Sequence, residues 1–313
     1  MSSSVSVIVP ATTANIGPGF DCLGAALSLY NQFDFQVLDA SAPRLTIQAE
    51  GQEADLVSID SDNLVYQSFL KVYDKIQREV PNIAIKINLN VPLSRGLGSS
   101  ATAIIGGLVG ANAIAGSPLS DAEILDIAIA IEGHPDNVAP ALLGNCQLST
   151  RRSDHSTIFC PVPWSADLVP VVAIPDFELS THEARSVLPP HCSYGDAIFN
   201  ASHLALMMKA LELGNEDWLK GALDDRLHQP YRTRLIKGYG AVREAALVAG
   251  AYGLVISGAG PTLLALCSQS MAEPVAMAMK KAWRKEGVEA VVQALSLDLY
   301  GTQVTSTEQH AFV

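Results

Sequence analysis

The stretch of sequence that decides the fold is Pro92-Leu93-Ser94-Arg95-Gly96-Leu97-Gly98-Ser99-Ser100-Ala101-Thr102. It follows residues 83–89, whose alternating apolar side chains predict a half-buried strand. It leads into residues 99–115, which are small and apolar on every side and therefore predict a buried helix. A glycine-rich turn between a strand and a helix can bind phosphate, because glycine permits close backbone approach and the first helix amides point outward. We interpret residues 92–102 as a phosphate-binding loop.

A turn that merely starts a buried helix is the alternative interpretation, and it would be preferred for a bare Gly-x-Gly. The loop also lacks the lysine of a Walker motif. The longer string P-x-x-x-G-L-G-S-S-A, however, resembles the ATP-binding motif of the GHMP kinases, named for galactokinase, homoserine kinase, mevalonate kinase and phosphomevalonate kinase. These kinases carry a second glycine-rich segment near the C-terminus, and residues 257–262, Ser-Gly-Ala-Gly-Pro-Thr, fit it. The resemblance implies that residues 92–102 bind ATP.

Composition excludes several classes of protein. The chain has 313 residues, 49% of them hydrophobic, and a formal net charge of −12, which argues against nucleic-acid and anionic-membrane partners. The sequence has neither an 18-residue apolar run nor the pattern of a signal peptide. Its five cysteines are scattered, which is typical of reduced thiols. We expect a cytoplasmic protein; a homodimer is compatible with the sequence, which does not set the oligomeric state.

The order of predicted elements indicates an α+β fold. In the first half we predict strands at 5–9, 29–38, 44–49 and 83–89 and helices at 63–78, 99–115 and 121–131, the first capped by Asp62 and the last opened by a capping box at Ser120 and Glu123. In the second half we predict strands at 169–174, 252–256, 262–267 and 289–294 and helices at 194–213, 216–224, 240–250 and 272–286.

Prolines at positions 161, 163 and 170 indicate a boundary between two domains, residues 1–165 and residues 166–313. The resemblance implies the two-domain GHMP kinase fold. Its N-terminal, ATP-binding domain is similar to the second domain of ribosomal protein S5, and its C-terminal domain is ferredoxin-like.

Residues 10–24 leave the first strand as a polar, glycine-studded segment, which we expect to be a loop. Asp21 can bind a substrate ammonium and Asn15 a substrate hydroxyl. An Asx turn with a surface aspartate is the alternative. The pattern A-T-x-A-N-x-G-x-G-F-D-x-L-G resembles the signature of the homoserine kinase family. That resemblance implies ATP-dependent phosphorylation of L-homoserine in threonine biosynthesis, with another GHMP kinase, of the mevalonate or sugar type, as the alternative.

Residues 132–140 resemble the second motif of the family, in which the glutamate, here Glu132, coordinates Mg²⁺. Ser100 and the nucleotide phosphates would complete a shell of oxygen ligands, which this cation prefers. A helix end with a satisfied loop histidine is the alternative. The resemblance places His134 beside the substrate and Asn137 where mevalonate kinases carry a basic aspartate. No general base is therefore assured, although Asp136 is adjacent.

Two further segments resemble parts of the family that hold the amino-acid substrate. Thr181 and Arg185 match a T-x-x-x-R stretch, in which the arginine binds the carboxylate; a helix N-terminus with an exposed arginine is the alternative. Arg232 matches a second carboxylate-binding arginine, with Arg234 as the weaker candidate. Two guanidinium groups suit the bidentate binding of one carboxylate. The same resemblance places Gly260 at the substrate.

Overall fold

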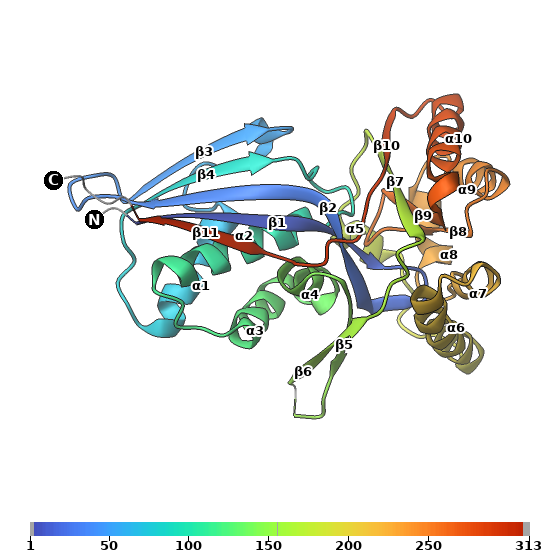
Figure 1. Ribbon diagram of the computed structural model, residues 1–313, viewed down its shortest axis with the longest axis horizontal. Helices are drawn as coiled ribbons and strands as arrows, with labels where there is room; N and C mark the ends of the chain where they lie inside the picture. Colours follow the sequence, from blue (N-terminus) through green and yellow to red (C-terminus); the bar gives the residue numbers. More distant parts are fainter. Residues whose placement is uncertain (1–2, 155, 309–313) are drawn as a thin grey trace.

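The computed structural model describes residues 3–154 and 156–308, which form two units joined end to end (Figure 1). The first unit is built on a seven-stranded sheet with the order β11-β1-β2-β4-β3, to which β5 and β6 are added beside β2. Its strands are β1 (Ser3–Asn15), β2 (Gly19–Val37), β3 (Leu45–Gly51), β4 (Ile83–Leu89), β5 (Cys146–Arg151), β6 (Thr157–Val162) and β11 (Gln303–Glu308).

Helices cover one face of the first sheet (Figure 1). They are α1 (Leu64–Ile76), α2 (Ser99–Ile114), α3 (Asp121–Glu132) and α4 (Pro135–Leu143), with the short helix η1 (Ala54–Leu56) before α1. Along β4, buried and partly exposed residues alternate strictly, which confirms the half-buried strand predicted there. The capping box that opens α3 is also confirmed, with both of its reciprocal hydrogen bonds formed.

Helix α2 is buried over most of its surface, as its composition predicts. Gly106 and Gly110 let it approach the sheet closely, because a Cβ atom on either would lie within 2.4 Å of the ring of Phe33 or Phe35. A larger residue at either position would push the helix away from the sheet. This packing fixes the direction in which the N-terminus of α2 points.

The second unit contains a four-stranded antiparallel sheet with the order β10-β7-β9-β8. Its strands are β7 (Leu168–Pro175), β8 (Gly253–Ile256), β9 (Leu263–Ser268) and β10 (Ala290–Ala294), and helices α9 (Tyr239–Val248) and α10 (Ala272–Lys285) precede β8 and β10. In chain order the sheet therefore reads 4-1-3-2 with β-α-β-β-α-β connections, which is the ferredoxin-like arrangement. The expected α+β fold with this second domain is confirmed.

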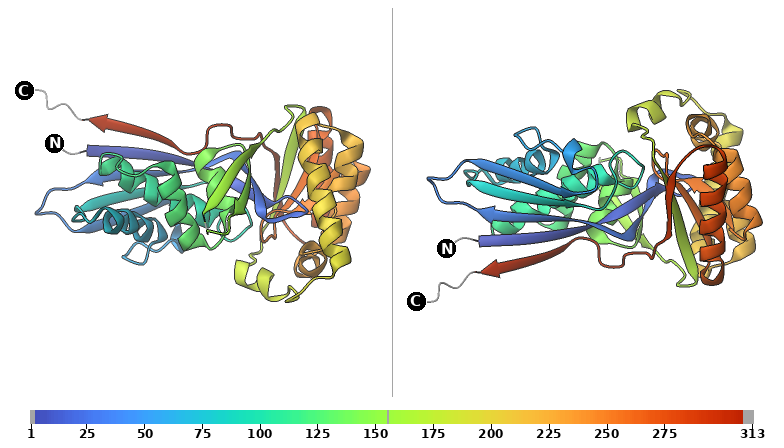
Figure 2. Two further views of the ribbon diagram at one scale, coloured as in Figure 1. Left: turned by 90° about the horizontal axis from the view of Figure 1, so that it is seen from below. Right: turned by 90° about the horizontal axis from the view of Figure 1, so that it is seen from above.

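Both faces of the second sheet are buried, since every residue of β7 is buried. Helices α9 and α10 cover one face, and the opposite face packs against the first unit and two further helices (Figure 2). The remaining helices of this unit are α5 (Thr181–Ser186), α6 (Tyr194–Leu213), α7 (Glu216–Ala222), α8 (Gln229–Arg232), η2 (Thr233–Leu235) and η3 (Gln269–Met271). The second sheet is thus packed directly against the first unit.

Residues 10–24 do not form the loop that we expected from their glycines and polar side chains. Strand β1 continues to Asn15 and β2 begins at Gly19, so the segment is a hairpin with a tight turn. Two register shifts, at Pro10/Ala11 and at Ala14/Asn15, bend the hairpin away from the body of the sheet. Its tip is buried in the second unit, where a Cβ atom on Gly17 would lie 2.7 Å from the carbonyl oxygen of Leu223, so this glycine serves a close contact and does not mark an exposed loop.

Other details differ from the sequence-based expectations. Asn63, not Asp62, caps α1, because its side chain accepts hydrogen bonds from the amides of Val65 and Tyr66. Several elements were not predicted: strands β5, β6 and β11, the short helices η1, η2, η3 and α8, and helix α4, which begins at Pro135 and contains Pro140. Strand β11 pairs with β1, so residues 303–308 lie in the first sheet. The division of the rest of the chain near residue 165 stays a prediction.

Within residues 3–154 and 156–308, no helix combines the length and the apolar composition that crossing a bilayer requires.

Candidate active site

The glycine-rich segments that the sequence singles out meet at a cavity of about 190 Å³ between the two units. Its walls are Asn15, Asp21, Ser94, Gly96, Gly98, Ser99, Ser100, Glu132, His134, Asp136, Asn137, Leu179, Ser180, Thr181, Arg185, Arg232, Gly258, Ala259 and Gly260. All the residues that we predicted to bind the second substrate are among them. The hairpin, the phosphate loop and the second glycine-rich segment therefore belong to one site.

The phosphate loop is clamped to the hairpin. The amide of Thr12 donates to the carbonyl of Leu97 over 3.0 Å, and Gly98 caps α2 with a φ of 67°. A Cβ atom on Gly98 would lie 2.0 Å from Oγ1 of Thr12, so only glycine fits there without displacement. The first amides of α2, beginning at Ser99, have no acceptor within the helix and face the cavity with the positive end of the helix dipole.

The second glycine-rich segment packs directly against this loop. The hydroxyl of Ser257 donates to the carbonyl of Gly96 over 2.6 Å, and the amide of Thr262 donates to the carbonyl of Arg95 over 3.1 Å. The amide of Gly258 in turn donates to the carbonyl of Ala14 in the hairpin. Hydrogen bonds thus hold the three segments against one another.

Only part of the predicted ATP-binding stretch faces the cavity. Pro92, Leu93, Arg95, Leu97, Ala101 and Thr102 are not in its walls. The guanidinium group of Arg95 points away and forms ion pairs with Glu53 and Glu178, at 3.0 and 3.2 Å. The charge of Arg95 is therefore already compensated, and the loop offers main-chain amides and hydroxyls.

A second cavity, of about 300 Å³, adjoins the first at the phosphate loop. The two share Ser94, Ser99 and Ser100, and the remaining walls are mostly apolar: Asn31, Phe33, Leu56, Val57, Ser58, Asp62, Asn63, Leu64, Val65, Ile87, Leu89, Leu93 and Ala103. This cavity was not predicted from the sequence, because its walls outside the phosphate loop come mainly from η1, the start of α1 and the sheet, and these segments contain no motif.

Ser100 and Glu132 lie together at the mouth of the first cavity. The hydroxyl of Ser100 donates to Oε2 of Glu132 over 2.8 Å. In the described part of the chain, no three His, Cys, Asp or Glu side chains gather as a metal centre. The two oxygens fit Mg²⁺ as a partial ligand set, which phosphate oxygens and water would complete.

A chain of hydrogen bonds runs from His134 through α4 to the hairpin. Nδ1 of His134 lies 2.6 Å from Oδ1 of Asp136, and Nδ2 of Asn137 donates to the same oxygen over 3.3 Å. Oδ1 of Asn137 accepts from the hydroxyl of Thr12 over 2.8 Å. Burial alone would lower the pKa of His134. The hydrogen bond to Asp136 and the charge of Asp136 together have a larger, opposite effect, so the pKa of His134 lies above its ordinary value.

Asp21 and Arg185 form an ion pair across the cavity, with Nη1–Oδ2 and Nη2–Oδ1 distances of 3.0 and 2.7 Å. The amide of Asp21 donates to Oδ1 of Asn15, whose Nδ2 donates to the carbonyl of Gly258. Asn15 therefore links the hairpin to the second unit and holds the backbone of Asp21 in place. Thr181 begins α5 one turn before Arg185, and both line the cavity.

Arg232 is 2% exposed, and no carboxylate of the described residues lies within ion-pair distance of it. Its Nε donates to the carbonyl of Ala184 and its Nη1 to that of Gly258. Burial, and then the nearby charge of Arg185, lower the pKa of Arg232 to about 10. Arg234, the weaker candidate, is exposed and lies outside the cavity walls.

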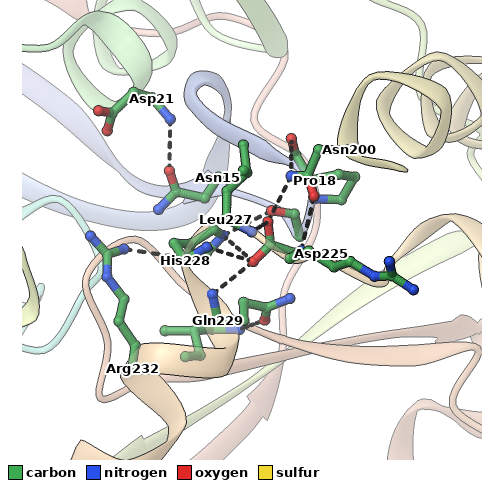
Figure 3. A network of polar contacts seen from close by, with 12 residues as sticks. Asn15, Pro18, Asp21, Asn200, Asp225, Leu227, His228, Gln229 and Arg232 are labelled. Atoms are coloured by element: carbon green, nitrogen blue, oxygen red, sulfur yellow. Dashed lines mark hydrogen bonds and ion pairs between the residues drawn. The ribbon is translucent and has the colours of Figure 1, made fainter. Parts of the chain in front are cut away.

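A buried polar network that was not predicted from the sequence lies beside Arg232 (Figure 3). It connects Asn200, Asp225 and His228 with the tip of the hairpin. None of these three residues belongs to a motif quoted above, and they come from two segments of the second half. A histidine four residues before Arg232 is the one local sign, since this spacing places both on the same side of a helix.

Comparisons with known proteins agree with this geometry. Residues 63–145 match the GHMP kinases N terminal domain and residues 207–285 match the GHMP kinases C terminal domain. The homoserine kinase of Crocosphaera subtropica is 60% identical over 304 residues, covering 97% of this chain and 98% of that protein. The chain belongs to the homoserine kinase family.

The structure of this chain is also similar to solved structures of related kinases. The crystal structure of homoserine kinase from Cytophaga hutchinsonii superimposes with a TM-score of 0.87 at 29% identity, covering 96% of this chain and 97% of that one. L. major mevalonate kinase, in complex with R-mevalonate, has a TM-score of 0.73 at 15% identity, covering 93% of this chain and 94% of that one. The second similarity shows the shared fold alone. The chain is thus an enzyme, a kinase of the homoserine kinase family.

Proposed function

We propose that this enzyme transfers the γ-phosphoryl group of ATP to the side-chain hydroxyl of L-homoserine, a step of threonine biosynthesis. The single observation that supports it best is the buried guanidinium group of Arg232, which has no carboxylate partner among the described residues. A buried cation without a direct ion pair is costly, and an anionic ligand offsets that cost. Arg185 and Asp21 lie in the same cavity and supply the charges that an amino acid requires.

The acceptor is oriented by its two charged groups. The carboxylate of homoserine binds Arg185 and Arg232, and its ammonium group binds Asp21. Thr181, Asn15, His134, Asn137 and Gly260 line the same cavity and surround the side chain of the acceptor. Binding both charged groups on the α-carbon in this way directs the hydroxyl at the other end of the molecule toward the phosphate loop, which supplies the alignment that phosphoryl transfer needs.

The nucleotide occupies both cavities. Its base and ribose lie in the apolar second cavity, and its phosphates pass Ser94, Ser99 and Ser100, which both cavities share. The amides at the start of α2 and the dipole of this 16-residue helix stabilise the phosphate charge. Mg²⁺, held by Glu132 and Ser100, would neutralise charge on the phosphate oxygens when bound.

No carboxylate acts as an essential base in this proposal. Asp136 is 2% exposed, and Oδ1 of its carboxylate is already bonded to His134 and Asn137. We infer that it orients these two side chains. The proton of the hydroxyl then passes to a phosphate oxygen or to water, which a loose, metaphosphate-like transition state permits.

The alternative, a GHMP kinase for mevalonate or a sugar, is not favoured. A neutral sugar makes no use of the two arginines, and mevalonate has no ammonium group for Asp21. The chain is 60% identical over nearly its whole length to a homoserine kinase, but only 15% identical to the mevalonate kinase. The free thiols of all five cysteines fit a reducing cytoplasm, which we propose as the location of the reaction.

An acceptor panel tests the proposal. Purified enzyme with MgATP is offered homoserine, mevalonate, galactose and shikimate, and ADP release is followed with a coupled assay. We expect ADP release with homoserine and formation of its O-phosphate. ADP release with another acceptor and none with homoserine would overturn the assignment.

A further inference from the structure

His228 lies fully buried between the hairpin tip and Arg232 (Figure 3). Its Nε2 is 2.9 Å from the carbonyl oxygen of Gly17, and its Nδ1 is 3.4 Å from Nη1 of Arg232. A carbonyl oxygen can only accept a hydrogen bond and a guanidinium group can only donate. Both contacts are therefore satisfied by one form of the ring, the neutral tautomer with its proton on Nε2.

The position of the ring is fixed from two sides. Asp225 has a fully buried carboxylate that accepts hydrogen bonds from the amides of His228 and Gln229, at 2.9 and 2.7 Å, and from Nδ2 of Asn200 at 2.7 Å. The ring of Phe20 stacks on the imidazole with the centroids 4.9 Å apart. The hydrogen bonds to its backbone and the stacking on its face hold the ring in the orientation that makes these two contacts.

The hydrogen bonds of Arg232 to the described residues involve Nε and Nη1 but not Nη2. Nε donates to the carbonyl of Ala184, and Nη1 donates to the carbonyl of Gly258 and to His228. Among the described residues Nη2 has no hydrogen-bond partner, although Arg232 is in the cavity wall. The imidazole thus completes a set of neutral acceptors that hold one side of the guanidinium group and direct the other side into the cavity.

We propose that His228 is a positioning residue for the acceptor: as a neutral acceptor at Nδ1 it directs Arg232 at the substrate carboxylate, and as a donor at Nε2 it anchors the hairpin that carries Asn15 and Asp21. The proposal rests on the function proposed above. The downward shift of the pKa of His228, which burial causes, supports the neutral state. His228 acts through Arg232 and the hairpin and does not itself line the cavity.

Two substitutions separate the two contacts. Nδ1 is two bonds from Cβ, as is the amide oxygen of asparagine, whereas Nε2 is three bonds away, as is the amide nitrogen of glutamine. His228→Asn can therefore keep the acceptor for Arg232, and His228→Gln can keep the donor for Gly17. We expect His228→Gln to raise KM for homoserine by about tenfold or more, the usual effect of losing a hydrogen bond to a charged group. In His228→Asn the increase in KM for homoserine should be several-fold smaller than in His228→Gln. In both variants KM for ATP should stay within about twofold of its value in the unsubstituted enzyme.

The control is Asn112→Leu, which removes a buried amide that bonds to both the carbonyl and the amide of Leu119, far from the cavity. It should lower Tm without changing KM for homoserine. If KM in the His228 variants follows only their loss of Tm, or if glutamine and asparagine behave alike, the positioning role is wrong.

A measurement on the unsubstituted enzyme covers the case in which the variants fold poorly. The ¹⁵N shifts of the imidazole should show a neutral ring with its proton on Nε2 at neutral pH; the other tautomer or a charged ring overturns the proposal. Failure of the proposed function would appear differently, as an unsubstituted enzyme that releases no ADP with homoserine.

Discussion

Asp21 and Arg185 are 164 residues apart in the chain and form a two-bond ion pair across the acceptor cavity. Both side chains are more than a third exposed, so the pair adds little to the free energy of folding. Its negative and positive charges are complementary to the ammonium group and the carboxylate of an amino acid. An entering amino acid can therefore replace the pair with two equivalent ion pairs of its own, whereas a ligand with one charge leaves the other residue without a partner.

Because of this relationship, binding of the acceptor should weaken when either Asp21 or Arg185 loses its charge. Arg185→Met should lower kcat/KM for homoserine by about 10- to 100-fold, the equivalent of the 1.5 to 3 kcal/mol that a charge-assisted hydrogen bond contributes. KM for ATP should stay unchanged, because Arg185 is not in the wall of the second cavity. Steady-state kinetics with each substrate varied in turn checks this; an effect on KM for ATP alone would assign Arg185 to the nucleotide.

Glu132→Gln should lower kcat, and added Mg²⁺ should restore part of it. Glutamine keeps the size of the side chain and its hydrogen bond to Ser100, but it is a weaker ligand for a hard cation because it has lost the negative charge. The check is a titration of kcat against Mg²⁺ concentration in both enzymes. A loss that no concentration of Mg²⁺ relieves would contradict the role of Glu132 as a ligand.

Asp136→Asn tests the absence of an essential base. We expect the loss in kcat to remain well short of about 10⁴-fold, the upper end of what general base catalysis contributes. The reason is that Asp136 is occupied in orienting His134 and Asn137. Single-turnover measurement of the chemical step decides the matter, and a loss of about 10⁴-fold or more with KM unchanged would identify Asp136 as a base.

Gly98→Ala should disrupt the phosphate loop. Gly98 and Gly116 both have positive φ values, 67° and 87°, but a Cβ atom meets Oγ1 of Thr12 at 2.0 Å in the first case and nothing within 4 Å in the second. Gly116→Ala should therefore cost about 1 to 2 kcal/mol of unfolding free energy from backbone strain alone. Gly98→Ala should cost more and should also raise KM for ATP. Equal effects of the two substitutions would show that the close contact with Thr12 is unimportant.

The buried state of His228 predicts a pH dependence of stability. Burial is the main cause of its lowered pKa, so below the ordinary pKa of 6.5 the unfolded chain binds a proton that the folded protein does not. The stabilisation is complete above pH 6.5 and is lost as the pH falls toward the folded pKa, by up to about 1.4 kcal/mol per pH unit. Denaturant unfolding at pH 7.5, 6.5 and 5.5 should show a steeper loss for the unsubstituted enzyme than for His228→Asn. Parallel curves would mean that His228 titrates alike in both states.

The sequence predicted elements best where one local pattern sufficed. The alternation in β4 and the small, apolar surface of α2 each correspond to one environment, a half-buried strand and a buried helix. The hairpin at residues 10–24 was missed because its pairing and burial depend on the second unit, which no local pattern reports. Strand β11 was missed for the same reason, since its partner β1 is about 300 residues away in the chain.

The site was predictable to the extent that it consists of motifs. The structure brings Asn15, Asp21, Arg185 and Arg232 to one cavity, and prefers Arg232 to Arg234 by burial. A motif does not report where a side chain points, so the sequence could not predict that Arg95 points away from the cavity and pairs with Glu53. Nor does it report which residues support others, and the network of Asn200, Asp225 and His228 therefore appeared only in three dimensions.

The pairing of β11 with β1 has a consequence for how the protein is made. A ribosome synthesises β1 before the second unit and β11 after it, yet the two strands lie side by side in the finished sheet (Figure 1). The N-terminal unit must therefore wait, with one edge of its sheet unprotected, until the entire second unit has been translated. Until β11 is present, the backbone groups on that edge of β1 lack their partner strand, and such an unpaired edge can pair with another chain.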